Sequence, residues 1–369
     1  MEADVEKKIA FMKGNEALAE AALRAGMTGY FGYPITPQTE VIEYLCKAKN
    51  PNDDKYPKFT VLQAESEVSS INMVYGAAAA GGRIMTTTSS PGFSLMQEGI
   101  SYIACADIPC VIADVQRGGP GLGTIQPSQG DYFQAVKGGG HGDYKLITFA
   151  PNSVQEVVDY TFNAFDLATK WMCPVLILSD GAIGQMMEKV VLPEPIPART
   201  ADEMRDEKPW ATNGKGNRKQ RNIITSLNIQ SDAMERRNNE LQEKYRKIEA
   251  EEVRYETYKA DDAEIIITAY GLSSRVCKKA VDIARAEGLK IGLVRPITVW
   301  PFPTKIIDEF AAKPNVKFFI DVEMNVGQMV EDVKLVVNGR KPVYFYGRTG
   351  GILATAEDTL QKQNSQRWK

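Results

Sequence analysis

Histidine is almost absent from this chain of 369 residues, because His141 is the only one. A Ser-His-Asp triad would have to use that residue. His141 stands in "GGGHGDYK", and a run of glycines is more typical of a flexible loop than of a base held in place by a carboxylate. The sequence therefore gives little support to a hydrolase of the triad type.

Cysteines are few and scattered, five in all. An odd, scattered set is typical of a protein in the reducing cytoplasm and not of a disulfide framework. The pair Cys105 and Cys110 has no second pair that would complete a metal site, and the cysteine clusters of ferredoxins are missing. We therefore expect a cytoplasmic protein that holds neither a metal ion nor an iron–sulfur cluster of its own.

Long apolar runs and an excess of one charge are also missing. No segment reaches the roughly 20 apolar residues of a membrane span, and the charged start of the chain does not resemble a signal peptide. The formal net charge of -3 gives no reason to expect a nucleic acid or an anionic membrane as partner. The sequence also lacks a Walker loop, an HExxH motif and a Gly-Asp-Gly motif completed by downstream asparagines. Any diphosphate or Mg²⁺ must therefore be held by another chain.

Strand and helix patterns alternate along residues 1–190. The apolar strands, such as "PCVIADVQR" and "CPVLILSD", are continuous runs, as expected when helices cover both faces of a parallel sheet. They predict a doubly wound α/β domain with a mostly parallel sheet. Residues 263–369 repeat the alternation and predict a second, smaller α/β domain. Residues 191–262 are polar and highly charged, which predicts a linker with a solvated helix or, alternatively, a surface for another subunit.

Three strand-to-helix turns of the first domain carry residues of functional interest. Ligands of open parallel sheets bind outside the carboxyl ends of the strands, so a site is expected at such turns. The first turn is "YPITPQTE", in which we expect Thr36 to be the N-cap and Pro37 the first residue of the next helix. A hydroxyl and free N–H groups at a helix start attract a carboxylate or phosphate. A rigid loop with a capping threonine is the alternative.

The other two turns carry charged side chains. In "QAESEVSS", Ser66 is expected to cap a helix, and a carboxylate at Glu65 or Glu67 would suit the helix dipole equally well. The Ala/Gly run that follows permits close helix packing, so a carboxylate at its start could meet a cofactor. In "VQRGGPGLGT", Arg117 follows a buried strand and could clamp a carboxylate. A plain surface arginine is the alternative.

Taken together and in this order, these segments resemble the alpha subunit of the 2-oxoacid:ferredoxin oxidoreductases. The resemblance covers nearly the whole chain and includes "GNEALAEAALRAG", "YPITPQTE", "QAESEVSSINMVYGAAAAGG", "TTTSSPGFSLMQEGISY" and "VQRGGPGLGT". It implies that residues 1–190 form the pyrimidine-side domain of a thiamine-diphosphate enzyme and that residues 263–369 form a transketolase C-terminal-like domain. Within the family, the enzymes for 2-oxoisovalerate and 2-oxoglutarate look most similar.

The resemblance also implies a role for each turn. Glu67, which stands at the family's distance before Gly76, would be the catalytic residue that hydrogen-bonds the aminopyrimidine ring of thiamine diphosphate. Thr36 and Arg117 would bind the 2-oxoacid. The other residues that the resemblance places against the cofactor are Pro34, Ile35, Ser90 and Pro91.

The activity that the resemblance implies needs partner chains. It is the oxidative decarboxylation of a 2-oxoacid, first 2-oxoisovalerate and next 2-oxoglutarate, with coenzyme A to acyl-CoA, CO₂ and reduced ferredoxin. A beta subunit would carry the diphosphate and Mg²⁺ site and an iron–sulfur cluster, and smaller gamma and ferredoxin-like subunits would complete a dimer of hetero-oligomers. The alternative is a non-catalytic assembly subunit of the same fold, which would not need a carboxylate at Glu67.

Overall fold

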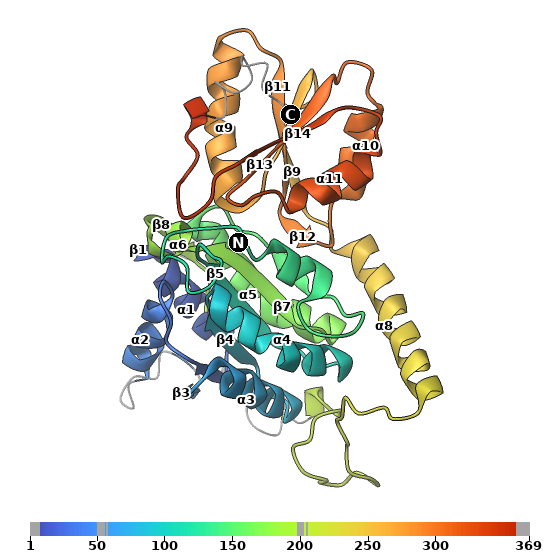
Figure 1. Cartoon of the computed structure of the whole chain (residues 1–369). Coiled ribbons are helices and arrows are strands. Elements are labelled where there is room, and N and C mark those ends of the chain that lie inside the picture. Colours follow the sequence, from blue (N-terminus) through green and yellow to red (C-terminus); the bar gives the residue numbers. More distant parts are fainter. Residues whose placement is uncertain (1–7, 50–55, 57, 198–202, 204–205, 359–369) are drawn as a thin grey trace, which may run out of the picture.

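A seven-stranded sheet forms the centre of the N-terminal half in the computed structural model, which describes residues 8–49, 56, 58–197, 203 and 206–358 (Figure 1). The strands lie in the order β12-β6-β7-β5-β4-β2-β3, and all neighbours run parallel except β12, which is antiparallel to β6. The strands are β2 (Gly29–Gly32), β3 (Thr60–Gln63), β4 (Ile84–Thr88), β5 (Val111–Gln116), β6 (Ile147–Phe149), β7 (Val175–Asp180) and β12 (Thr298–Trp300).

Two groups of helices cover this sheet. The helices are α1 (Gly14–Arg24), α2 (Thr39–Ala48), α3 (Glu67–Ala79), α4 (Ser90–Cys105) and α5 (Val154–Trp171). Helix α1 packs against α2 and α5, whereas α3 packs against α4. The central strands β4, β5 and β7 are buried along their whole length, which is why they read as continuous runs in the sequence. The predicted mostly parallel α/β class is confirmed.

A second sheet of five strands lies in the C-terminal half, in the order β14-β13-β10-β11-β9. Its elements are β9 (Tyr255–Tyr258), β10 (Ile265–Thr268), α9 (Gly271–Ala286), β11 (Ile291–Pro296), α10 (Thr304–Ala312), β13 (Phe318–Glu323), α11 (Met329–Val337) and β14 (Val343–Gly347). Strand β9 pairs antiparallel with β11, although it lies within the residues expected to form the linker. The C-terminal sheet thus takes in chain before residue 263.

One stretch of chain contributes a strand to each of the two sheets. Strand β11 belongs to the C-terminal sheet, but β12, which begins two residues after β11 ends, pairs with β6 in the N-terminal sheet. A single apolar stretch of the sequence, "IGLVRPITVW", therefore serves both sheets. The pairing of β12 with β6 holds the C-terminal half against the N-terminal half, at the edge of the seven-stranded sheet where β12 lies (Figure 1).

The remaining elements lie at the edges of the N-terminal half. Strands β1 (Lys8–Lys13) and β8 (Met187–Leu192) form a small antiparallel sheet. The expected helix in the charged segment is α8 (Ser231–Glu251), which runs along one side toward the junction of the two halves (Figure 1). It is not fully solvated, because Leu241, Tyr245 and Ile248 are buried. Two further short helices are α6 (Gly181–Gln185) and the π-helix η1 (Gln134–Gly138).

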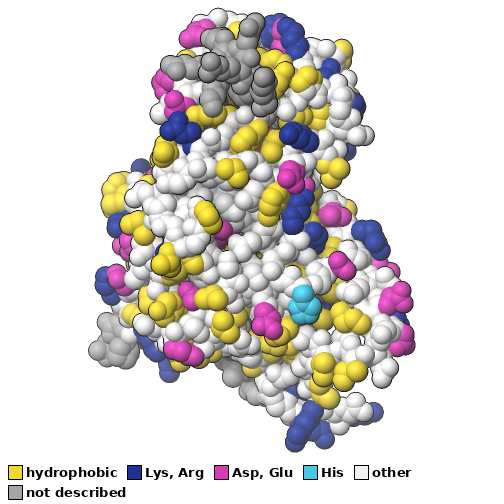
Figure 2. All heavy atoms as spheres, in the orientation of Figure 1, with side chains coloured by type: hydrophobic (Ala, Val, Ile, Leu, Met, Phe, Trp, Pro, Cys, Tyr) yellow, Lys and Arg dark blue, Asp and Glu magenta, His cyan; other side chains and the backbone are white. Residues whose placement is uncertain are grey.

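The surface carries both signs of charge. On the face shown in Figure 2, basic and acidic side chains are interspersed instead of gathered into one large patch. Within the ranges that the structure describes, no helix combines the length and the apolar character needed to cross a membrane.

Candidate functional site

The "YPITPQTE" turn leaves β2 at the carboxyl end of the large sheet. Helix α2 begins one residue after Gln38, its N-cap, so the expectation that Thr36 and Pro37 are the N-cap and first helical residue is wrong. Buried Gln38 anchors the turn instead: its side-chain amide donates to the carbonyl of Tyr33 (3.2 Å) and accepts from the Thr87 hydroxyl. Thr36 is left exposed at the tip of the turn, where its hydroxyl can meet a ligand.

Arg117 connects the first and third turns. Its Nη1 donates to the backbone carbonyl of Thr36 (2.8 Å) and its Nη2 to that of Leu122 (3.1 Å). The residue is only 9% exposed, and its Nε is buried without a hydrogen-bond partner in the described chain. Arg117 is therefore not a plain surface arginine. The structure brings it into direct contact with the turn that carries Thr36.

Glu67 and Glu65 lie in different environments. Glu67 is the first residue of α3 and is buried, 6% exposed, while Ser66 caps the helix by accepting from the N–H of Ser69 (3.2 Å). Glu65 is exposed and accepts a hydrogen bond from the Ser69 hydroxyl. Of the two glutamates, only Glu67 is therefore buried at this end of the sheet.

The start of α4 brings Glu67 and Arg117 to one place. The Ser90 hydroxyl accepts from the backbone N–H of Arg117 (3.0 Å), and Pro91 follows in the first turn of the helix. Two residues after Ser90, a Cβ on Gly92 would lie 2.6 Å from Glu67 Oε1 and 2.1 Å from Thr88 Oγ1. A side chain at Gly92 would thus displace the carboxylate.

The polar groups around Glu67 fit a hydrogen-bonding ring such as the aminopyrimidine. The hydroxyls of Thr88 and Ser89 are buried and have no hydrogen-bond partner among the described residues. Buried polar groups in proteins are nearly always satisfied, so these are candidates for groups that a bound molecule completes. Pro34 and Ile35, which were expected to contact the cofactor, are half-buried on the neighbouring turn.

Two buried aspartates near Ser90, Asp114 and Asp131, were not identified as candidate site residues from the sequence. Asp131 accepts a hydrogen bond from the Ser90 hydroxyl, and Asp114, whose carboxylate oxygens are buried without a hydrogen-bond partner among the described residues, is close enough for the charge of Asp131 to act on it. Burial raises the pKa of Asp114 well above its usual value, with the charge of Asp131 adding to the shift, and burial also raises the pKa of Asp131. Burial therefore favours the protonated form of each carboxyl group. An acidic residue inside the buried strand "VIADVQ" was the available signal.

A cavity of about 500 Å³ adjoins Arg117 at the junction of the two halves. One wall comes from the glycine-rich loop after Arg117 and from the start of α4, and the other from the loop before α11. The polar side chains that line it are Ser90, Ser94, Arg117, Ser128, Asp131, Asn325, Gln328 and Thr349. Arg117 is thus the one cationic side chain among the described residues of this lining.

Asp180 and His141 make hydrogen bonds that belong to the fold and not to the candidate site. Asp180 accepts from the N–H groups of Ala182 (2.8 Å) and Ile183 (3.1 Å) and so caps α6. His141 lies in the exposed glycine loop, where its carbonyl accepts from the Ser101 hydroxyl. In the described ranges, His, Cys, Asp and Glu side chains form no group of three or more that could hold a metal ion.

Two family models match the chain. Residues 20–259 match the model described as pyruvate flavodoxin/ferredoxin oxidoreductase, thiamine diP-binding. Residues 263–359 match the model described as pyruvate:ferredoxin oxidoreductase core domain II. The first match alone spans more than half of the chain.

Two of the curated relatives match this chain over almost their whole length. The ketoisovalerate oxidoreductase subunit VorB of Methanothermobacter marburgensis is 50% identical, covering 95% of this chain and 96% of its own. The 2-oxoglutarate synthase subunit KorA of Methanocaldococcus jannaschii is 37% identical, covering 95% and 98%.

Solved structures show the same fold. The 2-oxoglutarate:ferredoxin oxidoreductase from Magnetococcus marinus superposes with a TM-score of 0.81 at 28% identity, and 97% of this chain spans 65% of that chain. A split-gene transketolase shares the fold at 13% identity with a TM-score of 0.56, covering 95% of this chain and 96% of its own. The chain therefore belongs to the 2-oxoacid:ferredoxin oxidoreductases, a family whose matching N-terminal domain binds thiamine diphosphate.

Proposed function

We propose that this chain is the alpha subunit of an enzyme that oxidatively decarboxylates a branched-chain 2-oxoacid. The 2-oxoacid and coenzyme A would be converted to acyl-CoA, CO₂ and a proton, and the two electrons released would reduce two ferredoxin molecules. The observation that carries the proposal is the convergence of Glu67, the Thr36 turn and Arg117 at one end of the sheet. All three come from different strand-to-helix turns.

Each residue has a distinct task in this proposal. Glu67 would hydrogen-bond the aminopyrimidine ring, and its buried position beside Gly92 holds the carboxylate at the start of α3. The Thr36 hydroxyl would orient the substrate carbonyl, and Arg117 would bind the substrate carboxylate. Pro34, Ile35, Ser90 and Pro91 would line the cofactor pocket. When bound, thiamine diphosphate supplies the nucleophilic carbon and the electron sink for decarboxylation.

Two observations favour 2-oxoisovalerate over 2-oxoglutarate as substrate. The relative named for ketoisovalerate is 50% identical, against 37% for the relative named for 2-oxoglutarate. The second carboxylate of 2-oxoglutarate would need a further cation, and Arg117 stands alone as a cation in the described lining of the cavity. An apolar branched side chain has no such need.

The missing parts of the enzyme are proposed to lie on partner chains. The sequence has no diphosphate–Mg²⁺ motif and no cysteine cluster for iron and sulfur. A beta subunit would supply the first and an iron–sulfur cluster, and smaller gamma and ferredoxin-like subunits would complete a cytoplasmic dimer of hetero-oligomers. We propose residues 1–190, 191–262 and 263–369 as domain, connection and second domain, with β9 as a part of the connection that joins the second sheet.

The alternative function is a non-catalytic assembly subunit of the same fold. Such a subunit would have no use for a buried carboxylate held against Gly92, or for an arginine that contacts the Thr36 turn. The arrangement therefore favours the catalytic subunit.

The test is reconstitution. This chain is co-expressed with its genomic neighbours, and the purified complex is assayed for coenzyme-A-dependent reduction of a viologen dye. Pyruvate, 2-oxoglutarate and 2-oxoisovalerate are compared at equal concentrations, and 2-oxoisovalerate is expected to give the highest kcat/KM. A fully assembled complex that reduces the dye with none of the three would contradict the proposal.

A further inference from the structure

Gln129 is buried, 1% exposed, at the base of the glycine-rich loop that follows Arg117. Its side chain reaches into the C-terminal half: Nε2 donates to the carbonyl of Tyr270 (2.9 Å). Its Oε1 accepts from the Ser273 hydroxyl (2.7 Å) and from the backbone N–H of Met324 (2.9 Å). The amide side chain thus bonds both the start of α9 and the loop before α11.

The backbone of Gln129 makes a second set of bonds to the same partners. Its N–H donates to the carbonyl of Met324 (3.1 Å). Its carbonyl accepts from the Tyr270 hydroxyl (3.1 Å) and from Nδ2 of Asn325 (2.7 Å). Every polar atom of this residue therefore engages the C-terminal half.

The residues beside Gln129 dock in the same way. The Ser128 hydroxyl donates to the carbonyl of Met324 (3.3 Å), and Nε2 of Gln328 donates to the carbonyl of Gly130 (2.8 Å). The segment 128–130 is therefore held along its whole length by the loop before α11. It forms part of the wall of the cavity next to Arg117.

This docked segment is connected to Arg117 by two routes. Along the loop, Arg117 forms a backbone bridge with Pro127, and the N–H of Gly118 donates to the carbonyl of Gln126 (3.0 Å). Through side chains, the carboxylate of Asp131 accepts from Ser90, whose hydroxyl accepts from the N–H of Arg117 (3.0 Å). A shift of the segment would therefore move the backbone that carries Arg117.

We propose that Gln129 is a positioning residue through which the C-terminal half sets the place of Arg117. The inference rests on the proposed function, in which Arg117 binds the substrate carboxylate. Without the Gln129 amide, the Tyr270 carbonyl and the Ser273 hydroxyl would lose a hydrogen-bond partner inside a buried contact, which favours displacement of the segment. Displacement of a substrate-binding group by about 1 Å can cost roughly a hundredfold in rate.

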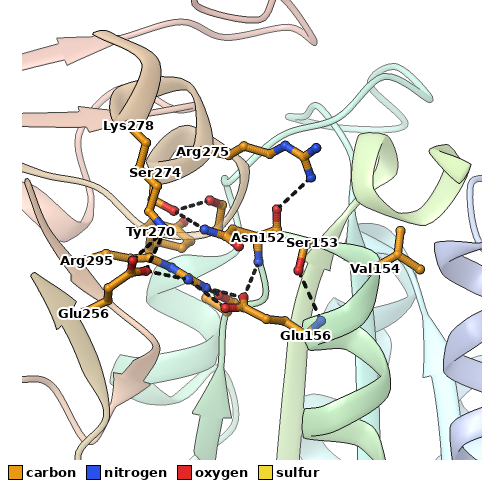
Figure 3. Close-up of polar contacts among 12 residues, drawn as sticks. Asn152, Ser153, Val154, Glu156, Glu256, Tyr270, Ser274, Arg275, Lys278 and Arg295 are labelled. Carbon is orange, nitrogen blue, oxygen red and sulfur yellow. Dashed lines mark hydrogen bonds and ion pairs between the residues drawn. The ribbon is translucent and has the colours of Figure 1, made fainter. Parts of the chain in front are cut away.

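The test uses the assembled complex with Gln129→Met, which removes the three side-chain hydrogen bonds at similar size. We expect the KM for the 2-oxoacid to rise about tenfold or more, while the KM for coenzyme A stays within about twofold. The matched control is Ser274→Ala, which removes another hydrogen bond between the halves, from Nδ2 of Asn152 (3.2 Å), and none of the side-chain bonds of Gln129 (Figure 3). The control is expected to keep the wild-type KM for the 2-oxoacid.

Hydrogen exchange gives a readout that does not depend on catalysis. Amides of residues 117–131 are expected to exchange faster in Gln129→Met than in the wild type, and at the wild-type rate in Ser274→Ala. If Gln129→Met does not assemble, Gln129→Glu, which lacks the donor to Tyr270, takes its place with the same expectation.

Some results would contradict the positioning role of Gln129, and another would contradict the proposed function. Unchanged KM for the 2-oxoacid and unchanged exchange in the Gln129 variant would overturn the positioning role. Equal rises in both KM values, or the same rise in Ser274→Ala, would overturn it as well, because they indicate general loosening of the contact between the halves. A wild-type complex without activity would overturn the proposed function instead, and the exchange rates would still decide whether Gln129 holds the loop.

Discussion

At the scale of single residues, burial separates two glutamates that the local sequence treats alike. Glu65 and Glu67 both lie near the start of α3, where the helix dipole favours a carboxylate. Only Glu67 is buried, against Gly92, whereas Glu65 is exposed and bonded to Ser69. The contact with Gly92 at the start of α4 places Glu67, and not Glu65, near the turn that carries Arg117. The proposed catalytic role therefore belongs to Glu67.

Glu67→Gln is expected to lower kcat of the assembled enzyme by at least about a hundredfold, because an amide keeps the shape but cannot share a proton with the cofactor. The complex should still assemble, since Gln fits the same space. The measurement is steady-state dye reduction, with size-exclusion chromatography to check assembly. Glu65→Gln is the matched control and should behave as wild type. Near-normal turnover by Glu67→Gln would refute its assignment.

Arg117→Ala is expected to raise the KM for the 2-oxoacid by roughly 10- to 100-fold, as expected for loss of a charged hydrogen bond worth about 1.5–3 kcal/mol. Arg117→Lys keeps the charge but not the two parallel N–H donors, so it should recover only part of the loss. Initial rates at varied 2-oxoacid concentration measure both. Saturation behaviour identical to wild type in Arg117→Ala would remove this residue from the substrate site.

At the scale of secondary-structure elements, helix starts depend on caps that the sequence shows only in part. Ser66 caps α3 as expected, but α2 starts later than expected because buried Gln38 bonds the turn before it. Asp180 caps α6 from a buried position at the end of β7. Such a buried cap makes the free energy of unfolding depend on pH.

Asp180→Asn tests this dependence. Burial raises the pKa of Asp180 to about 6, against the lowering effect of two backbone N–H donors. Because the folded pKa lies above the unfolded one, the stability contributed by protonation is present below about pH 4 and is lost as the pH rises through about 6. Relative to Asp180→Asn, which does not titrate, the wild-type free energy of unfolding should fall by roughly 1 kcal/mol between pH 5 and 7.

Urea unfolding at a series of pH values measures the difference between the two proteins. The comparison cancels other titrating groups, because both chains share them. A constant difference in the free energy of unfolding between pH 5 and 7 would show that Asp180 is not protonated in this range.

At the scale of the whole molecule, buried polar contacts join the two halves. Arg295 on β11 is 1% exposed, and its Nη1 donates to Glu156 at the start of α5 (2.8 Å) and to Glu256 on β9 (3.3 Å) (Figure 3). Burial acts to raise the pKa of Glu156, but the hydrogen bond and charge of Arg295 hold that pKa below its usual value. The ion pair links the N-terminal half to the second sheet.

Arg295→Met is expected to lower the free energy of unfolding of the full chain by roughly 3 kcal/mol, because it leaves Glu156 without its counter-ion in a half-buried site. Chemical denaturation followed by circular dichroism measures the loss. The double variant with Glu156→Gln should recover part of it, since the uncompensated charge is then gone. A loss below about 0.5 kcal/mol would mean that solvent already satisfies Glu156.

The sequence was sufficient for the fold class and for naming three turns that the structure brings together at one end of the sheet. Continuous apolar runs separated by amphipathic helices are enough to predict a parallel sheet, since the period and the burial are local properties. The turns carrying Thr36, Glu67 and Arg117 were found because ligands meet parallel sheets at strand ends. The roles of these residues remain proposals. Gln129 and the pair Asp114 and Asp131 were missed, because their partners are distant in the chain.

What the sequence determined by itself is therefore the local pattern: strands, helices, the stiff "YPITPQTE" turn and the carboxylate before an Ala/Gly helix. The tertiary structure decided which of two glutamates is buried, which carbonyls Arg117 bonds, and that one apolar stretch serves both sheets as β11 and β12. The physical reason is that burial and hydrogen-bond partners come from residues far along the chain, and periodicity carries no record of them.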